Sequence, residues 1–232
     1  IQQLHEAWII DIEDVPISME RRFSYANKRE IERRFEDFPE IGIATPNEKP
    51  YLRNLQIELT DACNERCIHC YLPNAKKDTS KALTKEQAID ILRQYREMEG
   101  LKVVFSGGEI LLYPYFFDVI EECKRLNLMI LLQSNLLSLT ERDIQRIKEL
   151  EVFNVQVSLY STDAHIHESI TQRKGSFAKT KHNLELLIQN NIPAMISCPV
   201  MDVNFPTVQD LRRYADEMQL DIYFDFMMMA GC

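Results

Sequence analysis

The sequence is poor in glycine and tryptophan, with six glycines and one tryptophan in 232 residues. It also lacks an excess of basic residues, because 27 Lys and Arg against 36 Asp and Glu give a net charge of −9. This balance argues against a nucleic-acid-binding protein, which would carry a basic stripe. No apolar run reaches the length of a membrane span, and the N-terminus lacks the apolar core of a signal peptide.

Cysteine is sparse as well, with six in the whole chain. That density is far below the density of small secreted disulfide frameworks. Free thiols without an export signal predict a reducing, cytoplasmic setting. The chain begins at Ile1 and stops at Gly231-Cys232, so we expect it to be a piece of a longer protein.

The first 50 residues differ in character from the rest. Residues Trp8–Ile12 form a short β-type run, and residues 18–38 carry apolar side chains at helical spacing among many charges. A linker punctuated by prolines follows. We therefore expect residues 1–50 to be a short, mostly helical N-terminal segment with a linker, and residues 51–232 to be one domain.

From residue 51 onward, β-type runs alternate with helical patterns. The expected strands are 55–60, 101–106, 128–133, 154–159, 194–200 and 221–226. The first expected helix follows a capping box of Thr84 and Gln87, the second spans Tyr113–Leu126 and the third follows Thr140. The fourth passes through Leu184–Ile188, and the fifth begins at Pro206. This alternation predicts an α/β fold with a parallel sheet and right-handed crossovers. Six such units predict a partial TIM-like (β/α)6 barrel, with its chemistry at the C-terminal rim.

Three thiols lie close together in the stretch Cys63–Cys70, at Cys63, Cys67 and Cys70. This stretch directly follows the first expected strand, so it lies on the predicted rim. Thiolates select zinc, copper(I) or iron–sulfur clusters. A closed structural zinc or ordinary iron–sulfur site takes four protein ligands. Three ligands therefore leave a metal open to a group that is not protein.

Two other interpretations of the cysteines stay open at this point. They are core thiols that happen to lie close in sequence, or ligands of a zinc ion that His69 completes. A zinc site of that kind would make the chain a binding module without catalysis.

A glycine pair follows the second expected strand. Gly107 and Gly108 let the backbone approach a ligand closely, and Glu109 then places a carboxylate beside that backbone, where it can receive an ammonium group. A tight turn with a solvent-facing glutamate is the plainer explanation. The position of this segment, one βα unit after the cysteines on the same rim, favours a shared site.

The chain resembles the core of radical S-adenosylmethionine (SAM) enzymes from about residue 52 to its end. Cys63, Cys67 and Cys70 match the three-cysteine motif of that superfamily, and Ser106–Glu109 matches the segment whose glutamate binds the methionine ammonium. The resemblance implies a 4Fe–4S cluster in which three irons are held by cysteine, while the amine and carboxylate of SAM chelate the fourth. The family usually has proline where this chain has Ile110.

The resemblance implies further contacts with SAM. Ser134 and Asn135 match the end of the third strand and Ser158 matches the end of the fourth, where the family contacts ribose or the methionine carboxylate. His69 stands where the family commonly has an aromatic residue whose backbone meets adenine. Arg173 is a candidate partner for the SAM carboxylate, because a guanidinium fork suits a carboxylate.

The stretch after the fourth strand departs from the family pattern. Tyr160 stands where many relatives have aspartate. His165 and His167 suggest a metal pair, but the family-like stretch through Gly175–Phe177 favours packing in a loop.

The three remaining cysteines have different expected roles. Cys123 and Cys198 occupy core positions and are predicted to be buried thiols. Cys232 follows the sixth strand, where radical SAM enzymes with a C-terminal SPASM or twitch extension have a ligand of an auxiliary iron–sulfur cluster. The resemblance therefore implies that Cys232 begins such a ligand set.

The resemblance also implies a reaction and its partners. Reductive cleavage of SAM gives methionine and a 5′-deoxyadenosyl radical, which abstracts hydrogen from a substrate. Flavodoxin or ferredoxin would supply the electron. The closest pattern is that of enzymes that modify ribosomally made peptides, in which residues 1–50 would be the remnant of, or bridge to, a leader-binding domain. A radical SAM enzyme for a haem or molybdopterin precursor is the alternative.

Overall fold

The computed structural model describes residues 52–72 and 82–226. The predicted strand Trp8–Ile12, the predicted helix 18–38 and Cys232 lie outside the described residues.

A six-stranded parallel sheet forms the centre of the molecule, with strand order β1-β2-β3-β4-β5-β6. The strands are β1 Asn54–Glu58, β2 Lys102–Ser106, β3 Met129–Ser134, β4 Asn154–Ser158, β5 Ala194–Pro199 and β6 Asp221–Asp225. Each strand pairs in register with its neighbour in sequence, for example Ile57 with Phe105 and Val157 with Ile196. Every predicted strand is confirmed to within two residues at each end.

Helices follow the strands as crossovers. They are α3 Lys85–Glu97, α4 Phe116–Arg125, α5 Glu141–Glu149, α6 Ala164–Thr171, α7 Ser176–Gln189 and α8 Val208–Glu217. The capping boxes that begin α3 and α5 form at Thr84 with Gln87 and at Thr140 with Asp143. The side chain of each threonine accepts a backbone N–H, and the side chain three residues later returns the bond.

Two details differ from the prediction. The stretch that contains His165 and His167 is helical, because Asp163 caps α6 by accepting from two backbone N–H groups. Pro206 does not open the last α-helix but lies in a 3₁₀ turn, Phe205–Thr207, directly before α8. The fixed φ of proline suits either kind of first turn.

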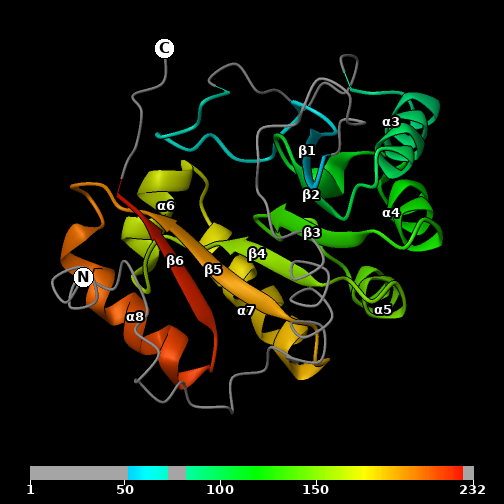
Figure 1. Cartoon of the computed structure of the whole chain (residues 1–232). Coiled ribbons are helices and arrows are strands. Elements are labelled where there is room, and N and C mark those ends of the chain that lie inside the picture. The colour runs from blue at the N-terminus through cyan, green and yellow to red at the C-terminus, as the bar shows by residue number, and fades with distance from the viewer. Residues whose placement is uncertain (1–51, 73–81, 227–232) are drawn as a thin grey trace, which may run out of the picture.

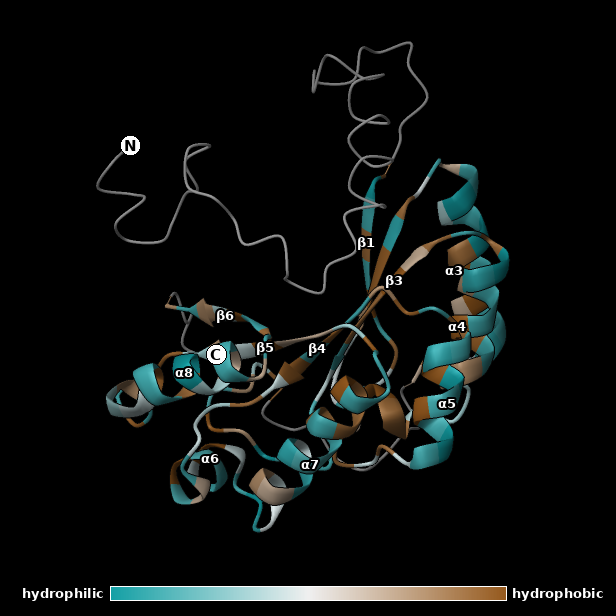
Figure 2. Ribbon diagram, turned by 90° about the horizontal axis from the view of Figure 1, so that it is seen from below, coloured by the Kyte–Doolittle hydropathy of each residue, from teal (hydrophilic) through white to brown (hydrophobic). Residues whose placement is uncertain are grey.

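The sheet curves into a barrel that stays open between β1 and β6, and the helices cover its convex side (Figures 1 and 2). Apolar side chains of alternate strand positions and of the inner helix faces form one continuous core. Cys123 and Cys198 are fully buried in this core, as predicted. The chain therefore forms the expected partial TIM-like (β/α)6 barrel.

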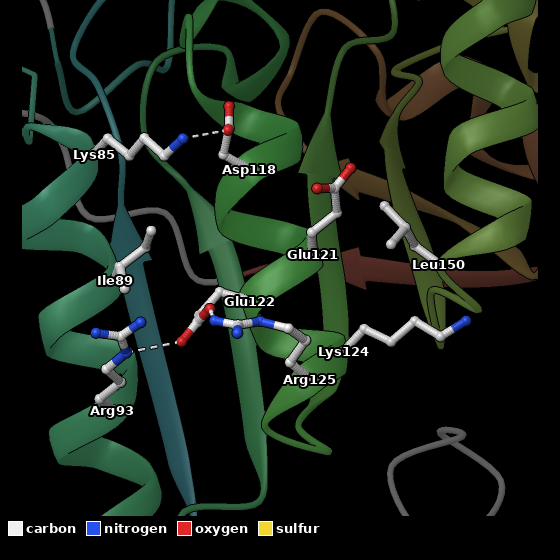
Figure 3. A pocket seen from close by; sticks show the side chains of 9 residues that line it. All are labelled: Lys85, Ile89, Arg93, Asp118, Glu121, Glu122, Lys124, Arg125 and Leu150. Atoms are coloured by element: carbon white, nitrogen blue, oxygen red, sulfur yellow. Dashed lines mark hydrogen bonds and ion pairs between the residues drawn. The ribbon is translucent and has the colours of Figure 1, made fainter.

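A pocket of about 610 Å³ lies on the outer side, between α3 and α4. Figure 3 shows its charged side chains facing one another, with Arg93 Nε 2.9 Å from the buried carboxylate of Glu122 and Lys85 paired with Asp118. Arg125 also pairs with Glu122. Because these charges compensate one another, we interpret the pocket as part of the packing interface between α3 and α4 and not as a reactive centre.

Of the helices in the described ranges, none combines the length and apolar character that a membrane crossing needs.

Candidate metal centre

The loop after β1 carries three free, half-buried thiols, those of Cys63, Cys67 and Cys70. The N–H of Glu65 lies 3.4 Å from Cys63 Sγ, and the N–H of Leu72 lies 3.3 Å from Cys70 Sγ. Donors of this kind favour the charged form of a sulfur. Burial acts in the opposite direction and raises the pKa of Cys63 to about 11, and it also raises the pKa of Cys67. A metal bound by these sulfurs would displace the thiol protons and stabilise the thiolate form.

The cysteine loop is held by the C-terminal end of α6 and by Arg173 in the turn that follows it. The N–H of Arg66 donates to Thr171 O and the N–H of Ile68 donates to Ile170 O, both at 2.9 Å. The guanidinium of Arg66 donates to Cys63 O at 3.0 Å, and that of Arg173 donates to Asn64 O at 2.7 Å. These bonds turn the loop carbonyls toward the guanidinium groups, while the N–H of Glu65 faces a sulfur.

The glycine pair after β2 packs directly on the beginning of the cysteine loop. Gly108 N donates to Thr60 O at 2.7 Å, and Glu109 N donates to Ala62 O at 2.8 Å. A Cβ at Gly107, where φ is +125°, would lie 2.3 Å from Thr60 O, and one at Gly108 would lie 2.2 Å from Ala62 O. Only glycine permits this contact between the two segments.

Glu109 is the most deeply buried acid of the site, with 1% of its surface exposed. Its Oε1 accepts from Leu111 N at 3.1 Å and from Ser134 Oγ at 2.7 Å, and its Oε2 accepts from Asn135 N at 2.8 Å. Burial raises the pKa of this carboxyl group, and the three donors oppose that rise. Oε2 keeps a lone pair for one further donor.

Asn135 joins this carboxylate to the cysteine loop. Its backbone N–H binds Glu109, and its Nδ2 donates to Asn64 Oδ1 at 2.7 Å. Its own carbonyl accepts from Thr180 Oγ1 of α7 at 2.8 Å. The ends of β1, β2 and β3 therefore form one hydrogen-bonded unit at the C-terminal rim.

The other predicted site residues lie around this unit. His69 sits on the cysteine loop, and its buried Nδ1 has no hydrogen-bond partner in the part of the chain that the structure describes. Ser158 is half-buried at the end of β4. Arg173 is exposed and uses its guanidinium on the loop carbonyl of Asn64, so its contact with a SAM carboxylate stays a prediction. Cys232 lies outside the described residues.

Glu65 was missed by the sequence analysis. Its side chain is buried, with 4% exposed, and its Oε2 lies 3.5 Å from Cys67 Sγ. Burial raises the pKa of this carboxyl group to about 7, and Oε1 has no hydrogen-bond partner within residues 52–72 and 82–226. In the sequence, Glu65 is recognisable as an acidic residue between two cysteines. Because it lies on a loop, periodicity does not predict which way its side chain points.

An aromatic stack borders the cysteines on the side of β4. The ring of Tyr160 meets the edge of His69 at 5.0 Å and stacks on His167 at 5.4 Å between centroids. His167 is fully buried and its Nδ1 accepts from Tyr160 N at 3.3 Å, whereas His165 is exposed. Packing is thus the role of His167, as expected, and the two histidines do not form a metal pair.

The donor set fits a cluster better than a single ion. In residues 52–72 and 82–226, no three His, Cys, Asp or Glu side chains converge closely enough to hold one metal ion. A zinc ion bound by the three thiols and His69 would need that convergence. Separated sulfurs on one loop suit an iron–sulfur cluster, in which different irons take different cysteines.

The chain forms an open parallel α/β barrel with three thiols and a buried glutamate at its C-terminal rim. These features are those of a barrel protein that binds a cofactor. Residues 57–215 match the family model of the radical SAM superfamily. The chain belongs to this superfamily.

Several characterised relatives align with the chain. The subtilosin biosynthesis protein AlbA of Bacillus subtilis is 27% identical over 175 residues, which are 75% of this chain and 39% of that protein. The AdoMet-dependent heme synthase of Methanosarcina barkeri is 24% identical over 172 residues, which are 74% of this chain and 49% of that protein. The chain thus spans less than half the length of these relatives.

Solved structures share the fold. Streptococcus suis SuiB superposes with a TM-score of 0.68 at 14% identity, covering 99% of this chain and 50% of that one. The AdoMet-bound anSMEcpe superposes with a TM-score of 0.64 at 20% identity, covering 75% of this chain and 52% of that one.

We expect Gly108→Ala to disrupt the site, because the added methyl group would overlap the Ala62 carbonyl. The variant should lose most of its iron after anaerobic reconstitution, measured by iron analysis. Gly175→Ala is the matched control: Gly175 has φ +80° but open space around it, so its substitution should cost about 1 kcal/mol of stability and leave iron binding unchanged. Full iron content in Gly108→Ala would contradict the close contact.

The buried His167 predicts a pH dependence of stability. Burial lowers the pKa of His167 from 6.5 to about 4, so the folded state disfavours the proton that the unfolded state accepts. Its contribution is complete above pH 6.5 and is lost as the pH falls toward 4, which amounts to about 3 kcal/mol. Urea unfolding should show a flatter pH profile for His167→Gln than for wild type. His165→Gln, on the exposed face of α6, should retain the wild-type slope; equal slopes in all three would refute the assignment.

Proposed function

We propose that this chain is the catalytic core of a radical SAM enzyme that binds a 4Fe–4S cluster through Cys63, Cys67 and Cys70. The observation that carries the proposal is the backbone contact of Gly108 and Glu109 with the cysteine loop. This contact puts the buried carboxylate of Glu109 beside the loop that carries the three thiols. When bound, the cluster and SAM supply a 5′-deoxyadenosyl radical for hydrogen abstraction.

The chain's own residues bind and orient the cofactors in this proposal. Glu109 receives the methionine ammonium at Oε2, while Ser134 and Asn135 fix the orientation of the carboxylate. Ser158, His69 and Arg173 remain candidates for the ribose, the adenine and the methionine carboxylate. Gly107 and Gly108 bring the backbone close enough for these contacts.

We propose a peptide as the substrate. The relatives support this choice through their names: AlbA and the sporulation killing factor maturation protein SkfB of Bacillus subtilis, and the mycofactocin maturase MftC of Mycobacterium ulcerans. SuiB has also been solved bound to its precursor peptide SuiA, although at 15% identity that likeness concerns the fold alone. In this proposal the reaction is a crosslink or another modification of a ribosomally made peptide with a leader.

A haem precursor is the second candidate substrate, because two heme synthases align at 24% and 21% identity. A peptide and a tetrapyrrole can be distinguished by incubating the reduced enzyme with SAM and each candidate. The true substrate should increase 5′-deoxyadenosine formation and should itself change in mass.

The remaining elements of the proposal concern parts beyond the described residues. Flavodoxin or ferredoxin would deliver the electron. Cys232 would begin the ligands of an auxiliary iron–sulfur cluster, and residues 1–50 would connect to a leader-binding domain. The setting would be cytoplasmic, where thiols stay reduced.

Replacing any one of Cys63, Cys67 or Cys70 by Ala should abolish SAM cleavage and remove the visible absorption of the cluster, because each thiolate binds a different iron. Reconstituted protein would be tested for 5′-deoxyadenosine by chromatography. Cys123→Ala and Cys198→Ala are matched controls, since both thiols are buried in the core and should retain iron. SAM cleavage that persists in the Ala variant of Cys63, Cys67 or Cys70 would contradict the cluster assignment.

Glu109→Gln should weaken SAM binding roughly 10- to 100-fold, the loss expected for one charge-assisted hydrogen bond. Titration calorimetry on the reconstituted protein would measure the affinity, with iron content unchanged. Glu122→Gln is the control, because this carboxylate is equally buried but pairs with Arg93 and Arg125 on the outer side. An unaltered SAM affinity in Glu109→Gln would remove Glu109 from the site.

A further inference from the structure

The hydroxyl group of Tyr160 lies next to Cys67, the second of the three cysteines on the loop. Its hydroxyl oxygen is 4.0 Å from Cys67 Sγ, at the outer limit for a hydrogen bond to sulfur, and its side chain is 5% exposed. The side chains of Ser158 and Glu65 also face this hydroxyl. A tyrosine hydroxyl in this position can donate its proton to the sulfur of Cys67.

The ring of Tyr160 packs between two histidines, and its backbone is held by two hydrogen bonds. His69 meets it edge-on from the cysteine loop, and His167 stacks on it from α6. Its backbone N–H donates to His167 Nδ1 at 3.3 Å, and its carbonyl accepts from Asn204 Nδ2 at 3.1 Å. Such a clamp leaves the hydroxyl little freedom to turn away from Cys67.

We propose that Tyr160 is a positioning residue that donates a hydrogen bond to the Cys67 thiolate and thereby raises the reduction potential of the cluster. The inference rests on the proposed function, because it requires a cluster on Cys67. It assigns a role to the residue that stands where many relatives have aspartate. A carboxylate there would add negative charge, whereas a phenol adds a proton donor.

The direction of the effect follows from electrostatics. Reduction adds an electron to the cluster and its sulfur ligands, so a donor to sulfur stabilises the reduced state more than the oxidised state. Loss of the donor must therefore lower the potential. A residue that only fills space would leave the potential unchanged when its hydroxyl alone is removed.

The test compares Tyr160→Phe with wild type in the reconstituted holoprotein. The midpoint potential is measured by a redox titration followed by electron paramagnetic resonance of the reduced cluster. We expect a lower midpoint at equal iron content. Tyr214→Phe is the matched control, because Tyr214 is a half-buried residue of α8 whose hydroxyl oxygen is buried without a hydrogen-bond partner among the described residues, and it should not change the midpoint.

A second measurement reads the hydrogen bond itself. Exchange into deuterated water should give wild type one deuteron coupling to the reduced cluster that Tyr160→Phe lacks, beyond the couplings that both proteins share from the N–H groups of Glu65 and Leu72. If Tyr160→Phe does not fold, difluorotyrosine at position 160 keeps the shape and donates more strongly, so the midpoint should rise. An unchanged or raised midpoint in Tyr160→Phe, or an unchanged midpoint with difluorotyrosine, overturns the proposal. A wild type without any cluster signal refutes the proposed function as well.

Discussion

The site depends on two backbone hydrogen bonds, from Gly108 N to Thr60 O and from Glu109 N to Ala62 O. They join the loop after β1 to the loop after β2 at a distance that excludes any Cβ between them. All else at the rim follows from this contact. The position of the cysteine loop depends on where it begins, and Glu109 reaches the same rim because its backbone lies on that loop. Two glycines of a glycine-poor chain are used here for steric reasons.

Charge is the second constraint. Glu65 and Glu109 are buried beside three thiols, and burial raises the pKa of both carboxyl groups. Acidic groups buried together in this way favour a bound cation. The guanidinium groups of Arg66 and Arg173 are exposed, and they are engaged with the carbonyls of Cys63 and Asn64. An iron–sulfur cluster together with a ligand that carries ammonium and sulfonium charges fits this deficit, whereas a neutral ligand does not.

Much of this arrangement was predictable from the sequence, and the reason is periodic structure. Alternating apolar runs and capping boxes give the strands and helices within a few residues, and parallel order then places Cys63 and Glu109 on one rim. The predictions that failed concern local features without a periodic pattern. The direction of Glu65 on its loop depends on contacts with Cys67 and Asn135, which are close in space but not implied by spacing. Likewise, α6 is too short and too weakly amphipathic to be separated from a loop before its Asp163 cap is seen.

The open barrel explains why the site has two kinds of border. On the side of β1 to β3, hydrogen bonds through Asn135 make a polar, fixed wall around Glu109. On the side of β4, the wall is aromatic, with His69, Tyr160 and His167 in contact. Polar groups orient a small charged ligand, while stacked rings hold shape and exclude water from the sulfurs. The cysteine loop contacts both walls, so a substitution in either one reaches the three cysteines from a different side. The polar wall acts through Asn64, and the aromatic wall acts through His69 and Cys67.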